Sequence, residues 1–221
     1  MTADNYHLQD QFLEAFFSTQ FAPLFYLTGG TALTRFYFQH RTSIDLDLFT
    51  NQKDVNFNDV NRTVLHIGSD FEWSLKTQVS ADSFLQYIFV GANSRQLKID
   101  IVRDIPVHFG DIKVKKNIRI DSLENIGSNK ITAIFGRTDA KDYIDLYWIL
   151  HKTDLTFENL YDLSKKKDLG LTELYFSYAL AHVRDVTIFP VMILPLEWKK
   201  ITEYFLKLSE QLLIRVKPDE K

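Results

Sequence analysis

Apolar and polar positions change their period along the chain, and the change comes near residue 121. Before it, short apolar or alternating runs predict strands at 24–27, 45–49, 71–79, 84–90, 97–102 and 118–120. In the same part, helical spacing predicts helices at 8–21 and 31–39 and a third helix that ends near Ile67. We therefore expect an α/β domain over residues 1–121.

From residue 122 onward the pattern predicts helices only. Asp121 and Glu124 have the spacing of a capping box, which would open a helix ending near Gly136. Asp139 would cap the next helix, and the remaining periodic runs place helices at 140–152, 156–166, 172–184 and 196–216. We expect a helical domain over residues 122–221, with a disordered tail at 217–221.

The stretch Gly29-Gly30-Thr31 is the first candidate for chemistry. It follows the apolar run 24–27 directly and precedes a short helical pattern. Paired glycines let a ligand approach the backbone N–H groups closely, and a helix that starts there adds its positive end. The Thr31 hydroxyl could donate to a phosphate oxygen. The simpler alternative is a strand-to-helix turn without a ligand.

Two aspartates separated by one residue form the second candidate. In an extended strand Asp45 and Asp47 point to one face, and Leu46 points to the other. Adjacent carboxylates repel each other unless a cation lies between them. In the later strand 97–102, Lys98 and Asp100 also share a face. If that strand lies beside the first, Asp100 becomes a third carboxylate at the same metal site.

Charged residues at helical spacing form a third candidate. Lys130, Arg137 and Lys141 lie on one stripe, which in most proteins is a solvated face. Asp145 follows Lys141 by four residues inside a nearly all-apolar helix, where an unpaired carboxylate would be costly. Asp145 therefore either forms a structural helix pair with Lys141 or holds Lys130 or Arg137 at an active site.

The residues just before the Asp45 strand are less specific. Arg41 and Ser43 are either solvated loop residues or contacts for a triphosphate, for which Arg supplies fixed planar donors. We expect His40 to be a surface histidine.

Composition narrows the possible environments and partners. The net charge of −3 gives no overall signature of a nucleic-acid binder, although the lysine runs 113–116 and 165–167 could contact phosphates locally. The chain has no cysteine, which excludes a disulfide framework and a thiolate zinc site. Met1–Asp10 is polar, and no run approaches the ~18 apolar residues of a membrane span. We expect a soluble, cytoplasmic protein.

Together these motifs resemble one known family. They are Gly29-Gly30-Thr31-Ala32-Leu33, the segment from His40 to Phe49 with its Asp45-Leu46-Asp47, Lys98-x-Asp100, Lys130 with Ala133-Ile134 and Arg137, and Lys141-Asp142-Tyr143-x-Asp145-Leu146-Tyr147. The set resembles the AbiEii/AbiGii (MenT-like) nucleotidyl transferase toxins of the DNA polymerase β-like nucleotidyltransferase superfamily. The resemblance covers residues 24–150, and its one variation is Thr31 where many nucleotidyltransferases have serine.

The resemblance implies an α+β fold, with a small mixed-sheet nucleotidyltransferase core, flanking helices and a helical C-terminal region. It implies transfer of a nucleotidyl group from an NTP to an acceptor, which is tRNA in some members, and often the role of toxin beside a cognate antitoxin. Asp45, Asp47 and Asp100 would hold Mg²⁺ or Mn²⁺, and Lys130 and Asp145 would act in catalysis. Nucleotide binding would involve Gly29, Gly30, Thr31, Arg41, Ser43, Arg137 and Lys141. The alternatives are a protein or small-molecule acceptor, or a non-catalytic nucleotide-binding module.

Overall fold

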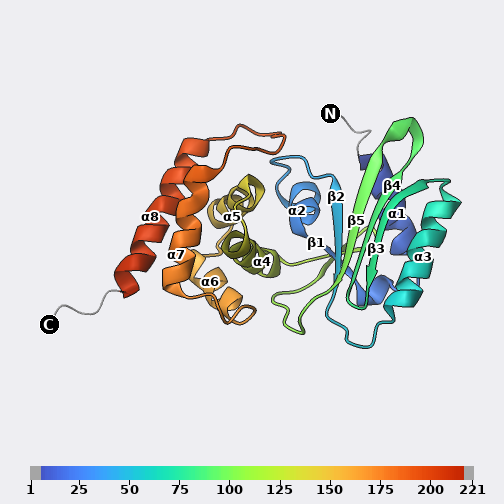
Figure 1. Cartoon of the computed structure of the whole chain (residues 1–221), viewed down its shortest axis with the longest axis horizontal. Coiled ribbons are helices and arrows are strands. Elements are labelled where there is room, and N and C mark those ends of the chain that lie inside the picture. The colour runs from blue at the N-terminus through green and yellow to red at the C-terminus, as the bar shows by residue number, and fades with distance from the viewer. Residues whose placement is uncertain (1–5, 217–221) are drawn as a thin grey trace. The chain divides into compact units, whose positions relative to one another are not determined.

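The computed structural model describes residues 6–216 and divides into two compact units (Figure 1). The first contains residues 1–37 and 43–122, and the second contains 38–42 and 123–221. The short segment 38–42 thus belongs with the helical part, although it lies within the α/β part of the sequence. The tail at 217–221, for which we expect disorder, lies outside the described residues.

A seven-stranded mixed sheet forms the first unit, in the order β3-β4-β5-β2-β1-β7-β6. Parallel pairing joins β2 to β5 and β1 to β7, while the other neighbours are antiparallel. The strands are β1 (Tyr26–Thr28), β2 (Asp45–Thr50), β3 (Ser74–Ala81), β4 (Phe84–Val90), β5 (Gln96–Arg103), β6 (Lys113–Lys115) and β7 (Ile118–Ile120). The mixed sheet confirms the fold class expected from the sequence.

Two longer helices, α1 (His7–Phe16) and α3 (Phe57–Asp70), lie against one face of the sheet (Figure 1). Their buried positions follow the helical spacing seen in the sequence, with Phe12 and Phe16 on α1 and Val60 and Val64 on α3. Phe25 joins these elements, because its ring packs edge-on against Phe16. The apolar core of this unit therefore lies on that side of the sheet, and the polar residues of β2 and β5 face the other way.

Several element boundaries differ from the sequence-based expectation for local reasons. The first helix ends at Phe16 rather than near 21, because the Thr19 hydroxyl donates to the Phe16 carbonyl and accepts from the Phe21 N–H. The short helix after β1 begins at the glycines as α2 (Gly29–Ala32) and continues as the π-helical η3 (Leu33–Tyr37). A short 3₁₀ turn, η2 (Ala22–Leu24), takes the place of the start of the first strand, and another, η4 (Ala92–Ser94), connects the antiparallel strands β4 and β5.

The two edge strands of the sheet, β3 and β6, differ most from the strands expected from the sequence. β3 begins only at Ser74, after Phe71 and Glu72 have formed the exit from α3, and every residue of it is exposed. β6 was not expected, since three residues of alternating Lys and Val give too short a signal. It pairs with β7 through a hairpin in which Lys116 and Asn117 both adopt left-handed φ, of 49° and 65°.

The second unit consists of packed helices (Figure 1). They are α4 (Leu123–Gly136), α5 (Ala140–Lys152), α6 (Phe157–Lys165), α7 (Glu173–Ala181), the 3₁₀ turn η5 (His182–Asp185) and α8 (Trp198–Val216). The Asp139 side chain accepts from the Lys141 N–H, as expected for the cap of α5. Gly127 brings α4 and α6 close together, because a Cβ there would lie 2.7 Å from Leu160. Within residues 6–216, no helix is long and apolar enough to cross a membrane.

Asp121, the expected cap of the following helix, makes contacts that reach well beyond a capping box. Asp121 lies fully buried at the end of β7, where its carboxylate accepts hydrogen bonds from the Thr28 hydroxyl and the Ser122 N–H. His108 Nε2 lies 2.9 Å from Asp121 Oδ1, the oxygen that also accepts from the Ser122 N–H. Asp121 therefore connects the end of β1, next to the glycine turn, to the end of β7.

We predict that Asp121→Ala destabilises the protein much more than Glu124→Ala. The first substitution leaves buried donors on Thr28 and Ser122 without an acceptor, at a cost of about 2–4 kcal/mol. The second removes a carboxylate at the start of α4, for which about 0.5 kcal/mol or less is expected. Urea unfolding of the two variants measures the difference. Equal losses of about 1 kcal/mol would instead support the capping box.

Candidate active site

Acidic side chains gather on the polar face of the two central parallel strands. Along β2 the exposure alternates, so that Leu46 and Leu48 are fully buried while Asp45 and Asp47 lie on the opposite face. The same alternation on β5 buries Ile99 and Ile101 and leaves Asp100 on the polar face. We call Asp45, Asp47 and Asp100 the acidic face.

Strand register places the acidic face in a defined row. Asp47 is the direct partner of Asp100 across the parallel β2–β5 pair, and this confirms the expectation that the two strands are neighbours. The row continues on both sides, so that four polar residues lie abreast on β4, β5, β2 and β1: Gln86, Asp100, Asp47 and Thr28. One row therefore joins the carboxylates to the last residue before the glycine turn.

Glycine is required at position 29 by the Asp47 side chain. Gly29 has a left-handed φ of 68°, and a Cβ on it would lie 2.4 Å from Asp47 Oδ2. The backbone at the start of α2 thus lies directly against the acidic face. Thr31 is fully buried, and its hydroxyl donates to the Asp45 carbonyl. In this structure that hydroxyl fixes the start of β2.

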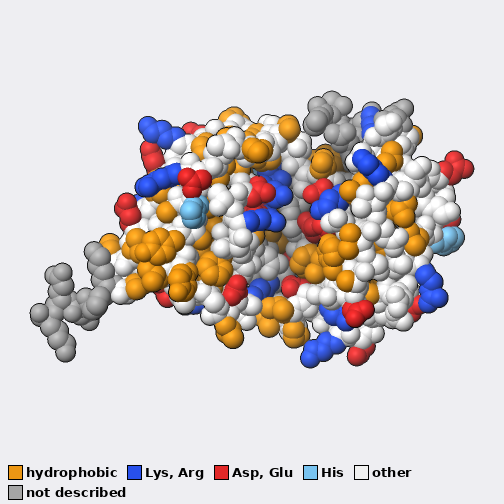
Figure 2. Space-filling model, viewed as in Figure 1, with side chains coloured by type: hydrophobic (Ala, Val, Ile, Leu, Met, Phe, Trp, Pro, Cys, Tyr) orange, Lys and Arg blue, Asp and Glu red, His pale blue; other side chains and the backbone are white. Residues whose placement is uncertain are grey.

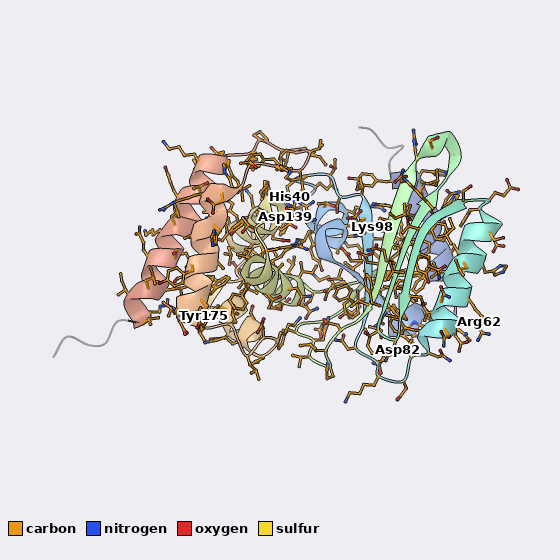
Figure 3. All side chains as sticks on the ribbon, in the orientation of Figure 1. His40, Arg62, Asp82, Lys98, Asp139 and Tyr175 are labelled. Carbon is orange, nitrogen blue, oxygen red and sulfur yellow. The ribbon has the colours of Figure 1, made fainter. Side chains whose placement is uncertain are left out.

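Lys98 lies among these carboxylates, on the strand position opposite Asp45 (Figure 3). Its Nζ is 2.7 Å from Asp100 Oδ2 and 3.8 Å from Asp45 Oδ2. Gln86 Nε2 donates to the other oxygen of Asp100 at 2.9 Å. Partial burial opposes the charge on Lys98, but Asp100, Asp45 and Asp47 outweigh it and raise the pKa of the ammonium group.

The donor set of the acidic face suits a hard divalent cation. All three side chains offer carboxylate oxygens, the ligands preferred by Mg²⁺, and their faces remain partly open to solvent. Among the described residues, however, no three acidic or histidine side chains converge closely enough to enclose a metal ion. Both oxygens of Asp100 are occupied, one by Lys98 and one by Gln86.

A second charged group lies in the helical unit, around α4 and α5. Asp142 and Asp145 are three residues apart and therefore share one face of α5. Lys130 Nζ, from α4, lies 2.8 Å from Asp142 Oδ1 and 2.7 Å from Asp145 Oδ2. All three side chains are buried, so Asp145 does hold Lys130, while the expected place of this pair at an active site stays a prediction.

The segment 38–42 adds two buried side chains to this group. Arg41 forms a two-point contact with Asp145, through Nε at 2.7 Å and Nη2 at 2.6 Å. His40, labelled in Figure 3, has its Nε2 2.9 Å from Asp145 Oδ1, and its ring centroid lies 5.0 Å from that of Trp148 at a tilt of 30°. His40 is fully buried, so the expectation of a surface histidine was wrong.

The remaining predicted residues are distributed between the two units. Arg137 is half exposed, and its Nε lies 2.7 Å from Asp142 Oδ2. Lys141 lies 3.3 Å from Asp139, and so the proposed Lys141–Asp145 helix pair does not form. Ser43 belongs to the first unit, where its carbonyl accepts from Gln9 Nε2 at 3.0 Å.

Opposite charges keep both buried carboxylates ionised. Burial alone would raise the pKa of Asp145, but Lys130 and Arg41, with hydrogen bonds from His40 and Arg41, hold it well below the ordinary value. Burial likewise opposes ionisation of Asp142, whose pKa is lowered by Lys130 and Arg137. Three cations, Lys130, Arg41 and Arg137, thus surround two carboxylates.

The sequence placed Lys98 on the strand face of Asp100 but gave it no role, and Gln86 and Asp142 were not assigned to these groups. Asp142 could have been found, since it lies on the same helix face as Asp145. Gln86 could not, because only the β4–β5 register places it beside Asp100.

We predict that Asp145→Asn strongly destabilises the protein at neutral pH, by about 3–5 kcal/mol, because it leaves Lys130 and Arg41 buried without their full counter-charge. The lowered pKa gives the wild-type protein a stability that is complete above about pH 4 and is lost as the pH falls through the folded-state pKa. Urea unfolding between pH 7 and pH 3 measures both effects.

Asp162→Asn is the matched control, because this carboxylate is 67% exposed in its pair with Lys165. We expect its neutral-pH stability to match that of the wild type within about 0.5 kcal/mol. A similar loss in the two variants would contradict the role of the buried group.

Comparison with known proteins identifies the family of the chain. A family model described as the nucleotidyl transferase AbiEii toxin of a type IV toxin–antitoxin system matches residues 11–209. No curated protein matches the chain.

Solved structures of similar fold span nearly the whole chain. A putative nucleotidyltransferase from H. pylori has a TM-score of 0.64 at 19% identity and covers 98% of this chain and 97% of its own. JHP933 from Helicobacter pylori has a TM-score of 0.62 at 19% identity, with coverage of 98% and 94%. MenT4, the nucleotidyltransferase toxin Rv2826c from Mycobacterium tuberculosis H37Rv, has a TM-score of 0.56 at 13% identity, with coverage of 94% and 83%.

At these sequence identities the solved structures show only that the fold is shared. The family model extends over most of the chain and therefore shows which family the chain belongs to. The chain belongs to the AbiEii nucleotidyltransferase toxin family and is a nucleotidyltransferase.

Proposed function

We propose that the acidic face carries out divalent-metal-dependent transfer of a nucleotidyl group from an NTP. The observation that supports this most directly is the row in which Asp47 and Asp100 lie abreast on parallel strands, next to the backbone of Gly29. A family of toxin–antitoxin systems also implies an NTP substrate and an antitoxin partner.

The chain's own groups would bind and orient the substrate as follows. Asp45, Asp47 and Asp100 would hold the cation. When bound, the cation would align the attacking and leaving oxygens and offset the negative charge on the α-phosphate. The backbone N–H groups of Gly30 and Thr31 donate to the phosphate oxygens, because the Thr31 hydroxyl already serves Asp45. Asp100, the third carboxylate of the acidic face, also accepts the proton of the acceptor hydroxyl. The roles of Lys130, Asp145, Arg41, Ser43, Arg137 and Lys141 in catalysis or nucleotide binding stay predictions.

RNA is the acceptor class that we favour, and the two lysine runs differ in how well they support it. In the run 165–167, Lys165 pairs with Asp162, and Lys167 donates to Asn125 and Asn129. Lys165 and Lys167 are therefore engaged in contacts within the chain and are less available to a ligand.

The other run lies on the β6–β7 hairpin of the first unit. Lys115 and Lys116 line a surface cavity of about 820 Å³ together with Arg35 and Phe36, and the carboxylates of Asp10 and Glu14 lie in the same lining. Within residues 6–216, no carboxylate lies within ion-pair distance of Lys113, Lys115 or Lys116. Exposed lysines beside an aromatic ring fit the phosphate backbone and bases of RNA. Figure 2 shows positive and negative side chains mixed over the visible face of the molecule. We therefore expect a local RNA contact rather than a broad basic surface.

We predict that Asp45→Ala and Asp47→Ala each reduce nucleotidyl transfer about a hundredfold or more, because the cation loses a ligand at the reacting phosphate. Both variants should stay folded, since each removes one of several like charges. The measurement is transfer of label from each of four α-labelled NTPs into total RNA, in Mg²⁺ and in EDTA.

Asp82→Ala serves as the control, because Asp82 is an exposed carboxylate in the β3–β4 turn (Figure 3). It should label RNA as the wild type does. Wild-type labelling by Asp45→Ala would refute the assignment, and labelled protein or small molecules in place of RNA would identify a different acceptor.

We also predict that replacing Lys113, Lys115 and Lys116 together by Gln weakens binding to tRNA and flattens its salt dependence. Loss of three phosphate contacts should reduce the slope of log K against log salt by about 2. Fluorescence anisotropy with labelled, unfractionated tRNA at several salt concentrations gives this slope.

Gln substitution of three dispersed, exposed lysines, Lys53, Lys76 and Lys207, changes the net charge equally. We expect a much smaller change in slope from this control. If the two triple variants lose affinity equally, the hairpin is not a specific contact and only net charge matters.

A further inference from the structure

Lys98 has the geometry of a cation placed inside the acidic face. It projects from β5 on the same side as Asp100 and lies at the register position opposite Asp45. Its ammonium group is 2.7 Å from Asp100 and 3.8 Å from Asp45, and it is about one-third exposed. An ordinary surface lysine can adopt many side-chain conformations. The register of β2 with β5 instead places this lysine next to two carboxylates.

The position has an electrostatic reason. Three carboxylates on two adjacent strands repel one another, and the repulsion is strongest where Asp47 and Asp100 are direct partners. One ammonium group between Asp45 and Asp100 offsets part of this repulsion. The sheet can therefore form without a bound metal ion.

The same contact hinders metal binding. A cation that uses Asp100 as a ligand needs an oxygen that Lys98 now holds, and a positive charge a few ångströms away repels it.

We propose that Lys98 is a built-in counter-ion of the acidic face, which stabilises the metal-free protein and competes with the divalent cation for Asp100 and Asp45. The proposal rests on the metal site of the proposed function. Lys98 is thus a positioning residue: it sets how tightly the cation is held, through carboxylates that it contacts directly.

The test is the binding of Mn²⁺ to metal-free protein, measured by isothermal titration calorimetry, together with thermal unfolding in EDTA. For Lys98→Met we expect Mn²⁺ to bind about tenfold more tightly than to the wild type, since a competing charge is gone. In EDTA the variant should unfold at a lower temperature than the wild type, and saturating Mn²⁺ should raise its unfolding temperature by more.

Two further variants separate charge from packing. Lys98→Arg keeps the charge and should bind Mn²⁺ as weakly as the wild type does. Lys76→Met removes an exposed lysine from β3 and should change neither measurement. Lys98→Gln provides the same comparison as Lys98→Met with a polar side chain.

The outcomes distinguish this inference from the proposed function. If wild type and Lys98→Met bind Mn²⁺ equally, or the variant binds it less tightly, Lys98 does not compete and the inference is wrong, while the metal site stands. If neither protein binds Mn²⁺, the metal site itself is refuted and the inference with it.

Discussion

The parallel pairing of β2 with β5 is the constraint on which the first unit depends. Its register sets Asp47 directly beside Asp100 and Asp45 beside Lys98, while the leucines and isoleucines between them enter the core. A shift of one residue would bury the carboxylates and expose the apolar set, so the core that stabilises the sheet also fixes the charges. Like charges are thereby held together by burial on the opposite face, at an electrostatic cost that Lys98 partly offsets.

The helical unit handles buried charge differently. There the carboxylates of Asp142 and Asp145 lie in the interior, and Lys130 and Arg41 neutralise them through short, direct contacts. Removing either the carboxylates or the cations leaves the remaining charges buried without a partner in a poorly polarisable environment. The segment 38–42 must therefore be in place for this unit to be complete, and it comes from a distant part of the sequence. The acidic face is partly open and holds excess negative charge, whereas the charged group in the helices is closed and nearly balanced.

Local patterns in the sequence predicted most elements and the carboxylates of the acidic face. Strict alternation in 45–49 and 97–102 depends only on which side of a strand is buried, and the expected pairing followed from their shared polar residues. What could not be predicted depends on contacts between distant residues. The burial of His40, the role of Asp121 between β1 and β7, and the place of Gln86 in the row all follow from tertiary register. The hydroxyl of Thr31 is a similar case, since its acceptor is a backbone carbonyl fourteen positions away.

The central claim is that the acidic face binds the divalent cation that the transfer reaction requires. Crystals of the protein grown without metal and then soaked in Mn²⁺ would test it most directly, because the anomalous scattering of manganese locates the ion independently of any activity. The account predicts an anomalous peak in direct contact with the carboxylate oxygens of Asp45 and Asp47, with Lys98 moved away from Asp100. A peak bound only by other residues, or no peak at this face at saturating Mn²⁺, would contradict it.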